Sequence, residues 1–366
     1  MLSDAAAPFS FEPSTAPVPA QERAARIADP GFGKVFTDHM AIVRYSTDRG
    51  WHDAAIEPRR PFSMDPSSAV LHYAQEIFEG LKAYPRPGGG AALFRPEANA
   101  RRFQESARRM AMPELPAEIF LESIRALVRA EKAWIPDGPD GSLYLRPFMI
   151  ASEAFLGVRP AGEYLYAVIA SAAGPYFRGG AKPLSLWATR DYIRAAPGGT
   201  GAAKCGGNYA ASLAAQADAI RNGCDQVVFL DAIERRWVEE LGGMNIFFVR
   251  DDGALVTPPL GGTILAGITR DSILTLARDM GLTVHEEPYS IEDWAADAAS
   301  GRLAECFACG TAAVVTPIGT VRGDGIDFAV GDGEAAGPVT ERLRDALVGI
   351  QRGDRPDPYG WIEEIG

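Results

Sequence analysis

The sequence predicts a protein of two domains that mixes helices and strands, in the α+β or α/β class. Three observations support this prediction. The chain has 366 residues, which is enough for two domains of ordinary size. Short apolar runs typical of strands alternate with stretches of helical periodicity in both halves. A segment rich in glycine and proline separates the halves, and we expect it to be the linker, residues 173–183.

The first half begins with an arm, residues 1–30, which we expect to be flexible because it is rich in Ala, Pro and Ser. Residues 31–172 form the expected smaller N-terminal domain. Its helices are predicted where apolar residues recur at helical spacing, and its strands where short apolar runs occur. The helices are Pro96–Met110 and Pro116–Trp134, and the strands are Met40–Ser46, a hairpin of "LKAY" and "AALFR", "SLYLRPFMIAS" and "YLYAVIAS".

The second half, residues 184–366, forms the expected larger C-terminal domain. Strands are predicted at "LSLWAT", "QVVFLD", "MNIFFV" and "ALVTP". Helices are predicted over Asn208–Asn222, Thr269–Met280, Ile291–Ser300 and Val339–Ile350, with Asn208 as a good N-cap type for the first. Two domains of this kind favour a functional site at their interface.

The bulk composition excludes several classes of function. A formal net charge of −12 and a pI near 5.0 argue against a nucleic-acid-binding or membrane-adhering surface. No apolar run reaches the ~20 residues of a spanning helix, and the N-terminus lacks the pattern of a secretory signal. Four cysteines are too few for a disulfide framework, so a cytoplasmic location is expected. No pattern of metal ligands is predicted.

One lysine stands out. Only five of the 36 basic residues are lysines, so a lysine in an unusual setting is informative. Lys204 lies in "TGAAKCGGNYAASL", among neighbours too small to shield it and just before a predicted helix. Desolvation would lower the pKa of such an amine toward the neutral form that makes a Schiff base. By itself, the pattern favours an ordinary loop lysine.

Four other motifs suit a pyridoxal phosphate (PLP) site. Glu239 and Glu240 precede a buried strand, where a carboxylate could meet a pyridinium nitrogen. Exposed N–H groups at the helix start near Ile268 and Thr269 could bind phosphate, as could the turn that contains Thr311. Arg101 or Arg102 could pair with the same phosphate. Solvated glutamates, an ordinary capped helix and surface arginines are the alternatives for each motif alone.

In motif order, from about Pro30 to Gly366, the chain resembles the branched-chain amino acid aminotransferases, PLP enzymes of fold type IV. The motifs are "HYAQEIFEGLKAY", "LYLRPF", "GGTGAAKCGGNYAASL", "EELGGMNIFFV", "GITRDS" and "FACGTAAVVTP". The resemblance implies reversible ping-pong transamination between leucine, isoleucine or valine and 2-oxoglutarate. This reaction ends the biosynthesis of these amino acids and begins their degradation.

The resemblance also implies a role for each cofactor-binding residue. Lys204 matches the lysine that forms the internal aldimine and acts as general base and acid. Glu240, five residues before Asn245, matches the partner of the pyridine nitrogen. The remaining matches are Tyr209 to the phenolic oxygen, Arg102 rather than Arg101 to the phosphate, and Ile268, Thr269 and Thr311 also to the phosphate.

The substrate site is implied in the same way. Tyr144 and Arg146 resemble the pair that places the α-carboxylate, and one of them would also bind the side-chain carboxylate of glutamate. Thr311 and Ala312 resemble one end of the carboxylate site. Tyr73 and Phe78 resemble the walls of an apolar pocket, which would discriminate a missing methylene only ~10–200-fold. The family implies a homodimer, and Val158 resembles a residue that reaches into the neighbouring subunit's pocket.

Two departures from the family pattern matter. Some relatives carry a redox-active Cys-x-x-Cys after the "GTA" turn, whereas Ala313 and Thr316 stand there in this chain. Cys306 and Cys309 form a Cys-x-x-Cys before the turn, in a predicted strand that would hold them ~10 Å apart, too far for a disulfide. Gly243 replaces a threonine of some relatives. Within the fold, the alternative functions are D-amino acid aminotransferase and aminodeoxychorismate lyase, and a non-catalytic binding protein is the alternative outside it.

Overall fold

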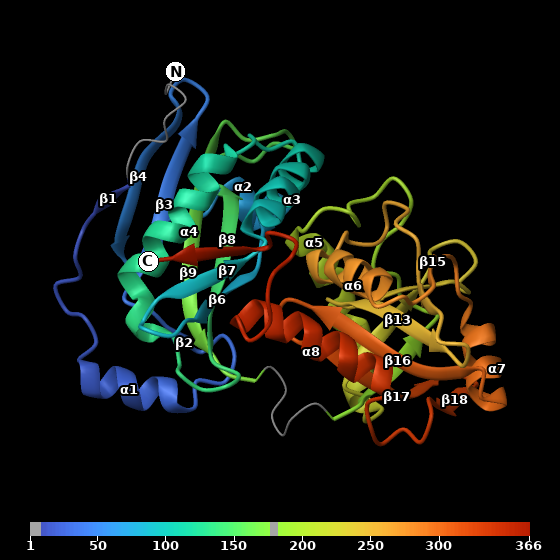
Figure 1. Ribbon diagram of the computed structural model, residues 1–366. Helices are drawn as coiled ribbons and strands as arrows, with labels where there is room; N and C mark the ends of the chain where they lie inside the picture. Colours follow the sequence, from blue (N-terminus) through green and yellow to red (C-terminus); the bar gives the residue numbers. More distant parts are fainter. Residues whose placement is uncertain (1–8, 176–181) are drawn as a thin grey trace. The chain divides into compact units, whose positions relative to one another are not determined.

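The computed structural model describes residues 9–175 and 182–366, which divide into two compact units (Figure 1). The described residues of the first unit are 9–175, 203–206 and 350–366, and those of the second are 182–202 and 207–349. Each unit has its own mixed sheet with helices. The expected α+β class is therefore confirmed, while most of the predicted linker lies outside the described residues.

The first unit is built on a largely antiparallel sheet whose main path runs β1-β4-β3-β9-β8-β6-β7-β19, with β2 beside β9 and β5 beside β8. The strands are β1 (Ser10–Phe11), β2 (Val35–Phe36), β3 (His39–Ser46), β4 (Gly50–Pro58), β5 (Glu76–Phe78), β6 (Leu81–Pro85), β7 (Ala91–Phe94), β8 (Ser142–Ala151), β9 (Glu163–Ala173) and β19 (Ile362–Ile365). The helices are α1 (Ala20–Ala28), α2 (Ala69–Tyr73), α3 (Pro96–Arg109) and α4 (Ala117–Glu131), the last followed by the 3₁₀ turn η1 (Lys132–Trp134).

Helices α3 and α4 cover one face of this sheet (Figure 1). The sequence of α4 buries Phe120, Ile124, Leu127 and Val128, which repeat at the spacing of one helical face. Phe120 contacts Phe103 of α3, with 5.4 Å between ring centroids. Each such buried side chain stabilises the fold by about 1.5–3 kcal/mol relative to exposure. The predicted helices match α3 and α4 to within one or a few residues.

The expected arm is not featureless where the structure describes it. Ser10 and Phe11 pair in parallel with β4, and α1 follows. The backbone N–H of Ser14 donates to Nε2 of His39 (2.9 Å), and that of Val18 donates to Asp38 (3.0 Å). These are backbone contacts to distant residues, so the composition of the arm does not reveal them.

The C-terminal segment corrects the expected domain ranges. We expected residues 184–366 to form one domain, but residues 350–366 belong to the first unit. There β19 pairs with β7, with Ile362 opposite Phe94 and Ile365 opposite Ala91. The linear sequence carries no signal for this pairing because antiparallel partners can be any distance apart in the chain.

The second unit has a sheet whose main path runs β12-β11-β10-β17-β16-β13-β14-β15, with β18 beside β17. The strands are β10 (Leu184–Thr189), β11 (Gln226–Leu230), β12 (Val238–Leu241), β13 (Asn245–Arg250), β14 (Leu255–Thr257), β15 (Val284–Glu286), β16 (Leu303–Gly310), β17 (Val314–Gly323) and β18 (Ile326–Ala329). The helices are α5 (Gly206–Arg221), α6 (Ile268–Asp279), α7 (Ile291–Ser300) and α8 (Pro338–Arg352).

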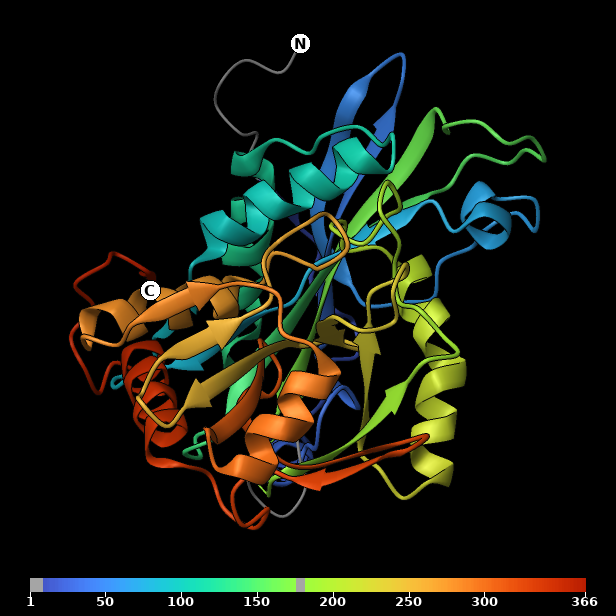
Figure 2. The same ribbon diagram turned by 90° about the vertical axis from the view of Figure 1, so that its right-hand side faces the viewer.

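Helix α5, yellow-green in Figure 2, runs beside the strands and packs Ala215 and Ala219 against Val227 and Phe229 of β11. It begins at Gly206 and not at the predicted Asn208. The side chain of Asn208 accepts from Thr200 Oγ1 (2.7 Å) and donates to the Thr200 carbonyl (2.8 Å). Asn208 therefore holds the preceding loop, a role that its N-cap preference does not predict.

Other predicted features can be compared directly. All four cysteines are free and buried, and Cys306 and Cys309 lie three apart in β16, as predicted. In the part of the chain that the structure describes, no helix is both long and apolar enough to cross a bilayer. Across the same residues, no group of three or more His, Cys, Asp or Glu side chains is arranged to hold a metal ion.

Candidate active site

The segment that carries Lys204 is anchored in the first unit by its backbone. The N–H of Lys204 donates to Oγ of Ser106 (2.9 Å), and its carbonyl accepts from the N–H of Phe78 (2.9 Å). On either side, Ala203 and Cys205 are buried in the core of this unit. The backbone of Lys204 is thus held in a fixed position. A solvent-exposed loop lysine needs no such anchoring.

The ring of Phe78 makes cation–π contacts with two basic side chains. Its ring centroid lies 4.9 Å from Nζ of Lys204 and 4.7 Å from Cζ of Arg146. Nη2 of Arg146 donates to the hydroxyl of Tyr144 (3.0 Å), two residues earlier on the same face of β8. The structure therefore brings together four of the predicted residues, Lys204, Phe78, Tyr144 and Arg146.

Helix α3 presents a polar stripe to the same region. Asn99, Arg102 and Ser106 are buried on one face of the helix. Arg102 binds Glu79 through Nε (2.7 Å) and Nη2 (2.8 Å), and Asn99 donates to Glu79 (2.7 Å). Burial alone would raise the pKa of the Glu79 carboxyl, but Arg102, Lys204 and Asn99 bring it below its ordinary value. Arg101 is exposed. The predicted choice of Arg102 thus falls on the buried, fixed arginine.

In the second unit, Glu240 is buried in β12 and Glu239 is half-buried. Oε1 of Glu240 lies 2.6 Å from Nη1 of Arg194 and accepts from the N–H of Leu265 (2.9 Å). Glu239 accepts from the hydroxyl of Thr263, and burial raises the pKa of its carboxyl. The two adjacent glutamates therefore differ, since Glu240 contacts a buried cation directly and Glu239 contacts a hydroxyl.

Tyr209 and the glycines next to Thr311 and Ile268 lie close to residues 243–245, between β12 and β13 or at the start of β13. A Cβ on Gly243 would lie 3.6 Å from the ring of Tyr209, and one on Gly310, next to Thr311, would lie 3.4 Å from Met244. A Cβ on Gly267, next to Ile268, would lie 2.0 Å from Asn245 Oδ1, so any larger residue there would require the Asn245 side chain to move. Ile268 and Thr269 open α6, and Thr311 and Ala312 form the turn from β16 to β17.

Tyr73 and Val158 stand apart from these contacts. Tyr73 ends α2, with its ring 6.4 Å from that of Phe155. Val158 is 90% exposed in the loop after β8, and Leu156 beside it is 71% exposed. The loop itself is braced by Arg159, which pairs with Glu153 (2.6 Å) and covers the ring of Phe155.

Sequence reasoning missed three residues of this site. Glu79 directly follows β5, and Glu76 in β5 accepts from the N–H of Gly206, but a glutamate in or just after a strand is not by itself a signal. Burial raises the pKa of Glu76 against the effects of Gly206 and Arg146. Arg194 lies in a loop of no regular pattern, and only the structure shows that it is buried against Glu240.

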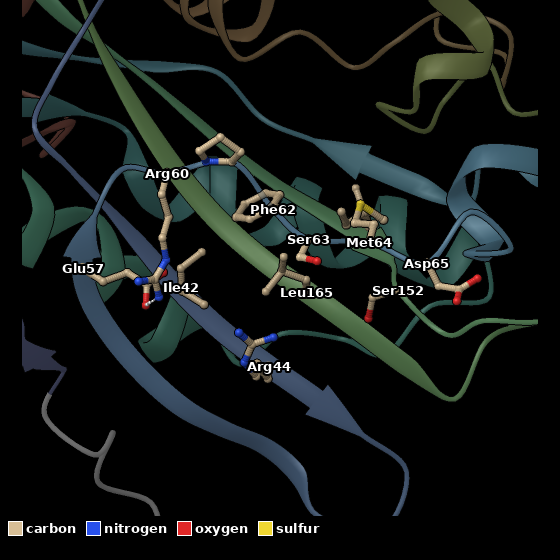
Figure 3. Close-up of a pocket in the computed structure, with 12 residues that line it drawn as sticks. Ile42, Arg44, Glu57, Arg60, Phe62, Ser63, Met64, Asp65, Ser152 and Leu165 are labelled. Atoms are coloured by element: carbon tan, nitrogen blue, oxygen red, sulfur yellow. Dashed lines mark hydrogen bonds and ion pairs between the residues drawn. The ribbon is translucent and has the colours of Figure 1, made fainter.

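A separate cavity of about 430 Å³ opens on the first unit, lined by β3, β4, β8, β9 and the segment 60–65 (Figure 3). Arg44 and Arg60 lie at it, and Arg60 binds Glu57 (3.1 Å). Its apolar lining includes Ile42, Phe62 and Leu165. None of the residues predicted to form the active site lines this cavity.

Comparison with known proteins identifies the family of the chain. Residues 76–321 match the class IV aminotransferase family. The chain is 55% identical over 361 residues to the branched-chain-amino-acid aminotransferase of Mycolicibacterium smegmatis, covering 98% of each chain. It resembles the branched-chain amino acid aminotransferase structure from Escherichia coli, with a TM-score of 0.74, 30% identity and coverage of 90% of this chain and 99% of that one.

A second structure shows the branched-chain amino acid aminotransferase from Thermobaculum terrenum in its PLP-bound holo form. Its TM-score is 0.72 at 26% identity, covering 90% of this chain and 98% of that one. The family match spans more than half of the chain, and the curated relative matches it almost from end to end. The chain belongs to the class IV aminotransferases, of PLP fold type IV, within the group of branched-chain amino acid aminotransferases.

Proposed function

We propose that the protein is a PLP-dependent transaminase that exchanges an amino group between L-leucine, L-isoleucine or L-valine and 2-oxoglutarate. The observation that carries the proposal is the anchored backbone of Lys204, with Nζ over Phe78 and with a charge that helps to lower the pKa of the buried Glu79 carboxyl. The substrate class follows the names of relatives that match almost the whole chain. The same names favour this function over D-amino acid aminotransferase and aminodeoxychorismate lyase.

The residues present fit PLP. Gly267 lets the N-terminus of α6 approach Asn245, where a Cβ would collide with it. In our proposal Ile268, Thr269, Thr311 and Arg102 would hold the phosphate, Tyr209 the phenolic oxygen and Glu240 the ring nitrogen. Arg102 and a helix N-terminus are suited to an anion. A buried carboxylate such as Glu240 suits a ring nitrogen that carries a proton.

The chemistry divides between cofactor and protein. Bound PLP supplies an electron-withdrawing ring that stabilises negative charge at the substrate Cα. Lys204 Nζ would accept the proton from that carbon and later return a proton, acting as base and acid in turn. The bonds to Phe78 and Ser106 hold Lys204 by its backbone, so its Cα can stay in place while the side chain moves.

The substrate residues fall into apolar and polar sets. Phe78 and Tyr73 would contact the branched side chain, and Tyr144, Arg146, Thr311 and Ala312 the carboxylate. Nε of Arg146 is buried and has no hydrogen-bond partner among the described residues, so it is available for a carboxylate oxygen. This suits 2-oxoglutarate and glutamate, which must bring a second carboxylate into an apolar pocket.

The assembly and location belong to the same proposal. We expect a homodimer, because Leu156 and Val158 are exposed apolar side chains on a braced loop and would be buried against a partner. Val158 would then contribute to the neighbouring subunit's pocket. Four free cysteines suit a reducing compartment, so we propose a cytoplasmic location.

The function can be tested with purified protein and PLP. We expect a long-wavelength absorption band that leucine with 2-oxoglutarate changes, and borohydride reduction should leave a phosphopyridoxyl group on the Lys204 peptide. Lys204→Ala, the matched control, should lose the peptide adduct and the turnover. Turnover with D-alanine in place of leucine distinguishes the proposed enzyme from a D-amino acid aminotransferase. A wild-type protein that binds no PLP, or that prefers D-alanine, would refute the proposal.

A further inference from the structure

Arg194 forms a buried ion pair with Glu240, and none of the roles predicted above involves Arg194. Their side chains are 2% and 4% exposed, and Nη1 of Arg194 lies 2.6 Å from Oε1 of Glu240. We infer that Arg194 is a positioning residue that keeps Glu240 ionised and correctly rotated for the ring nitrogen of PLP. This inference rests on the proposed function.

The first argument concerns charge. A carboxylate can hold the protonated ring nitrogen only in its ionised form, yet ionisation of a buried carboxylate is costly without a nearby cation. Arg194 is a cation in direct contact with Glu240, and a guanidinium stays protonated when buried. Glu240 is thereby compensated before the cofactor arrives.

The second argument concerns orientation. Oε1 of Glu240 takes both short contacts, from Arg194 and from the N–H of Leu265, whereas Oε2 takes the longer bond from Asn245 (3.4 Å). Two contacts on one oxygen fix the rotation of the carboxylate. Asn245 is fixed in turn, because its amide donates to the carbonyl of Leu265 (3.0 Å).

The third argument concerns Arg194 itself, which is held by the backbone. Nη1 also donates to the carbonyls of Thr263 (3.0 Å) and Gly201 (3.4 Å). A Cβ on Gly201 would lie 2.4 Å from the Thr263 carbonyl oxygen, so a glycine is required for these two segments to meet. Arg194 thus fixes Glu240 to the loop that leads into Lys204.

The alternative partner for Arg194 is the neighbouring carboxylate, Glu239. Its carboxylate is engaged by the hydroxyl of Thr263, and burial raises its pKa more than the charge of Arg194 lowers it. The direct ion pair is with Glu240, so the effect of Arg194 should pass through Glu240.

A double-mutant cycle tests this dependence, with the absorption band and the dissociation constant for PLP as readouts besides activity. Arg194→Gln should weaken PLP binding at least ~10-fold and shift the long-wavelength band. In a Glu240→Gln background the same substitution should weaken binding less than ~3-fold, because the group it acts through is already neutral. An equal effect in both backgrounds would overturn the inference.

Arg194→Lys keeps the charge but replaces the planar, pre-organised guanidinium with a shorter and more flexible side chain, so we expect binding about 3-fold weaker with the band retained. This variant decides the question where Arg194→Gln does not fold, since binding equal to wild type in it would contradict the positioning role. Arg250→Gln, which breaks the pair of Arg250 with Glu287 (2.7 Å) in the same unit, is the control and should leave PLP binding unchanged. If wild type fails to bind PLP, the proposed function fails; if wild type binds PLP and the Arg194 variants match it, only this inference fails.

Discussion

The backbone N–H of Phe78 donates to the carbonyl oxygen of Lys204, and the ring of Phe78 lies 4.9 Å from Nζ of the same lysine. One residue therefore fixes the Cα of Lys204 and also provides a surface for its ammonium group. The backbone bond survives any side-chain substitution at position 78 other than proline, so the two contributions can be separated experimentally.

Phe78→Leu should keep the anchored backbone and remove the cation–π contact, worth about 0.5–2 kcal/mol. Because this contact favours the ammonium over the neutral amine that attacks PLP, we expect the aldimine on Lys204, trapped by borohydride as the phosphopyridoxyl adduct, to form up to about 10-fold faster after PLP is added, with a small change in melting temperature. Phe148→Leu is the matched control, because Phe148 pairs with Phe78 across β5 and β8. Equal rates for Phe78→Leu and wild type would show that the ring contributes nothing.

Arg102→Ala should weaken PLP retention far more than Arg101→Ala, because Arg102 is buried and fixed by two bonds to Glu79 whereas Arg101 is exposed. It should also destabilise the fold by about 3–5 kcal/mol, since Glu79 is left buried without its cation. PLP retained after gel filtration and denaturant unfolding measure the two effects. Greater loss of PLP from Arg101→Ala would mean that the wrong arginine of the pair had been chosen.

Lys82 predicts a dependence of stability on pH. Burial lowers the pKa of its ammonium group to about 8, against the charge of Asp140. The unfolded chain therefore holds this proton more tightly than the folded one, so Lys82 destabilises the fold below about pH 8 and ceases to do so above about pH 10.5. Lys82→Met should raise the free energy of unfolding by up to about 3 kcal/mol at about pH 7.

The advantage of Lys82→Met should shrink as the pH rises from about 8 to about 10.5, which denaturant titrations near pH 7 and pH 10 would measure. Lys132→Met is the control, because Lys132 is exposed and its substitution should change stability little at either pH. A stabilisation that is the same at both pH values would show that the charge on Lys82 is not its cause.

The sequence predicted the parts of this protein that follow local rules. Helix α3 was expected over Pro96–Met110 and spans Pro96–Arg109, because its buried residues repeat at helical spacing and Pro96 suits a first turn. The pairing of β19 with β7 was missed, since strand pairing between distant segments depends on the whole fold. Locally determined elements are thus accessible from sequence, and long-range pairings are not.

The candidate site divides in the same way. Lys204 and the pair Glu239 and Glu240 were proposed from residue type and setting, and the family resemblance chose Glu240. In the structure Glu240 lies buried against Arg194, and Lys204 lies over the ring of Phe78. Glu79 and Arg194, which pair with site residues, could not be found because only the fold makes them partners of Arg102 and Glu240. A charged residue in a strand or loop is ordinary until its burial is known.

We predict that the Cys-x-x-Cys formed by Cys306 and Cys309 does not act as a redox switch. Both are free and buried in β16. Burial raises the pKa of the Cys309 thiol to about 12 and that of Cys306 well above its ordinary value. Since the thiolate is the reactive form, neither should react with a thiol reagent near pH 8 until the protein is unfolded. A loss of about 2 Da after mild oxidation of native protein, the mass of the two hydrogens lost in a disulfide, would contradict this.

The same shift fixes the sign of a stability effect. Because the folded state holds the Cys309 proton more tightly than the unfolded state, the contribution of Cys309 to stability is complete below about pH 9 and falls as the pH rises toward 12. Cys309→Ala removes this titration, so the stability advantage of wild type over Cys309→Ala should decrease by about 1.4 kcal/mol per pH unit above about pH 9. An advantage that stays constant from about pH 8 to about pH 11 would mean that the thiol ionises as readily in the fold as in water.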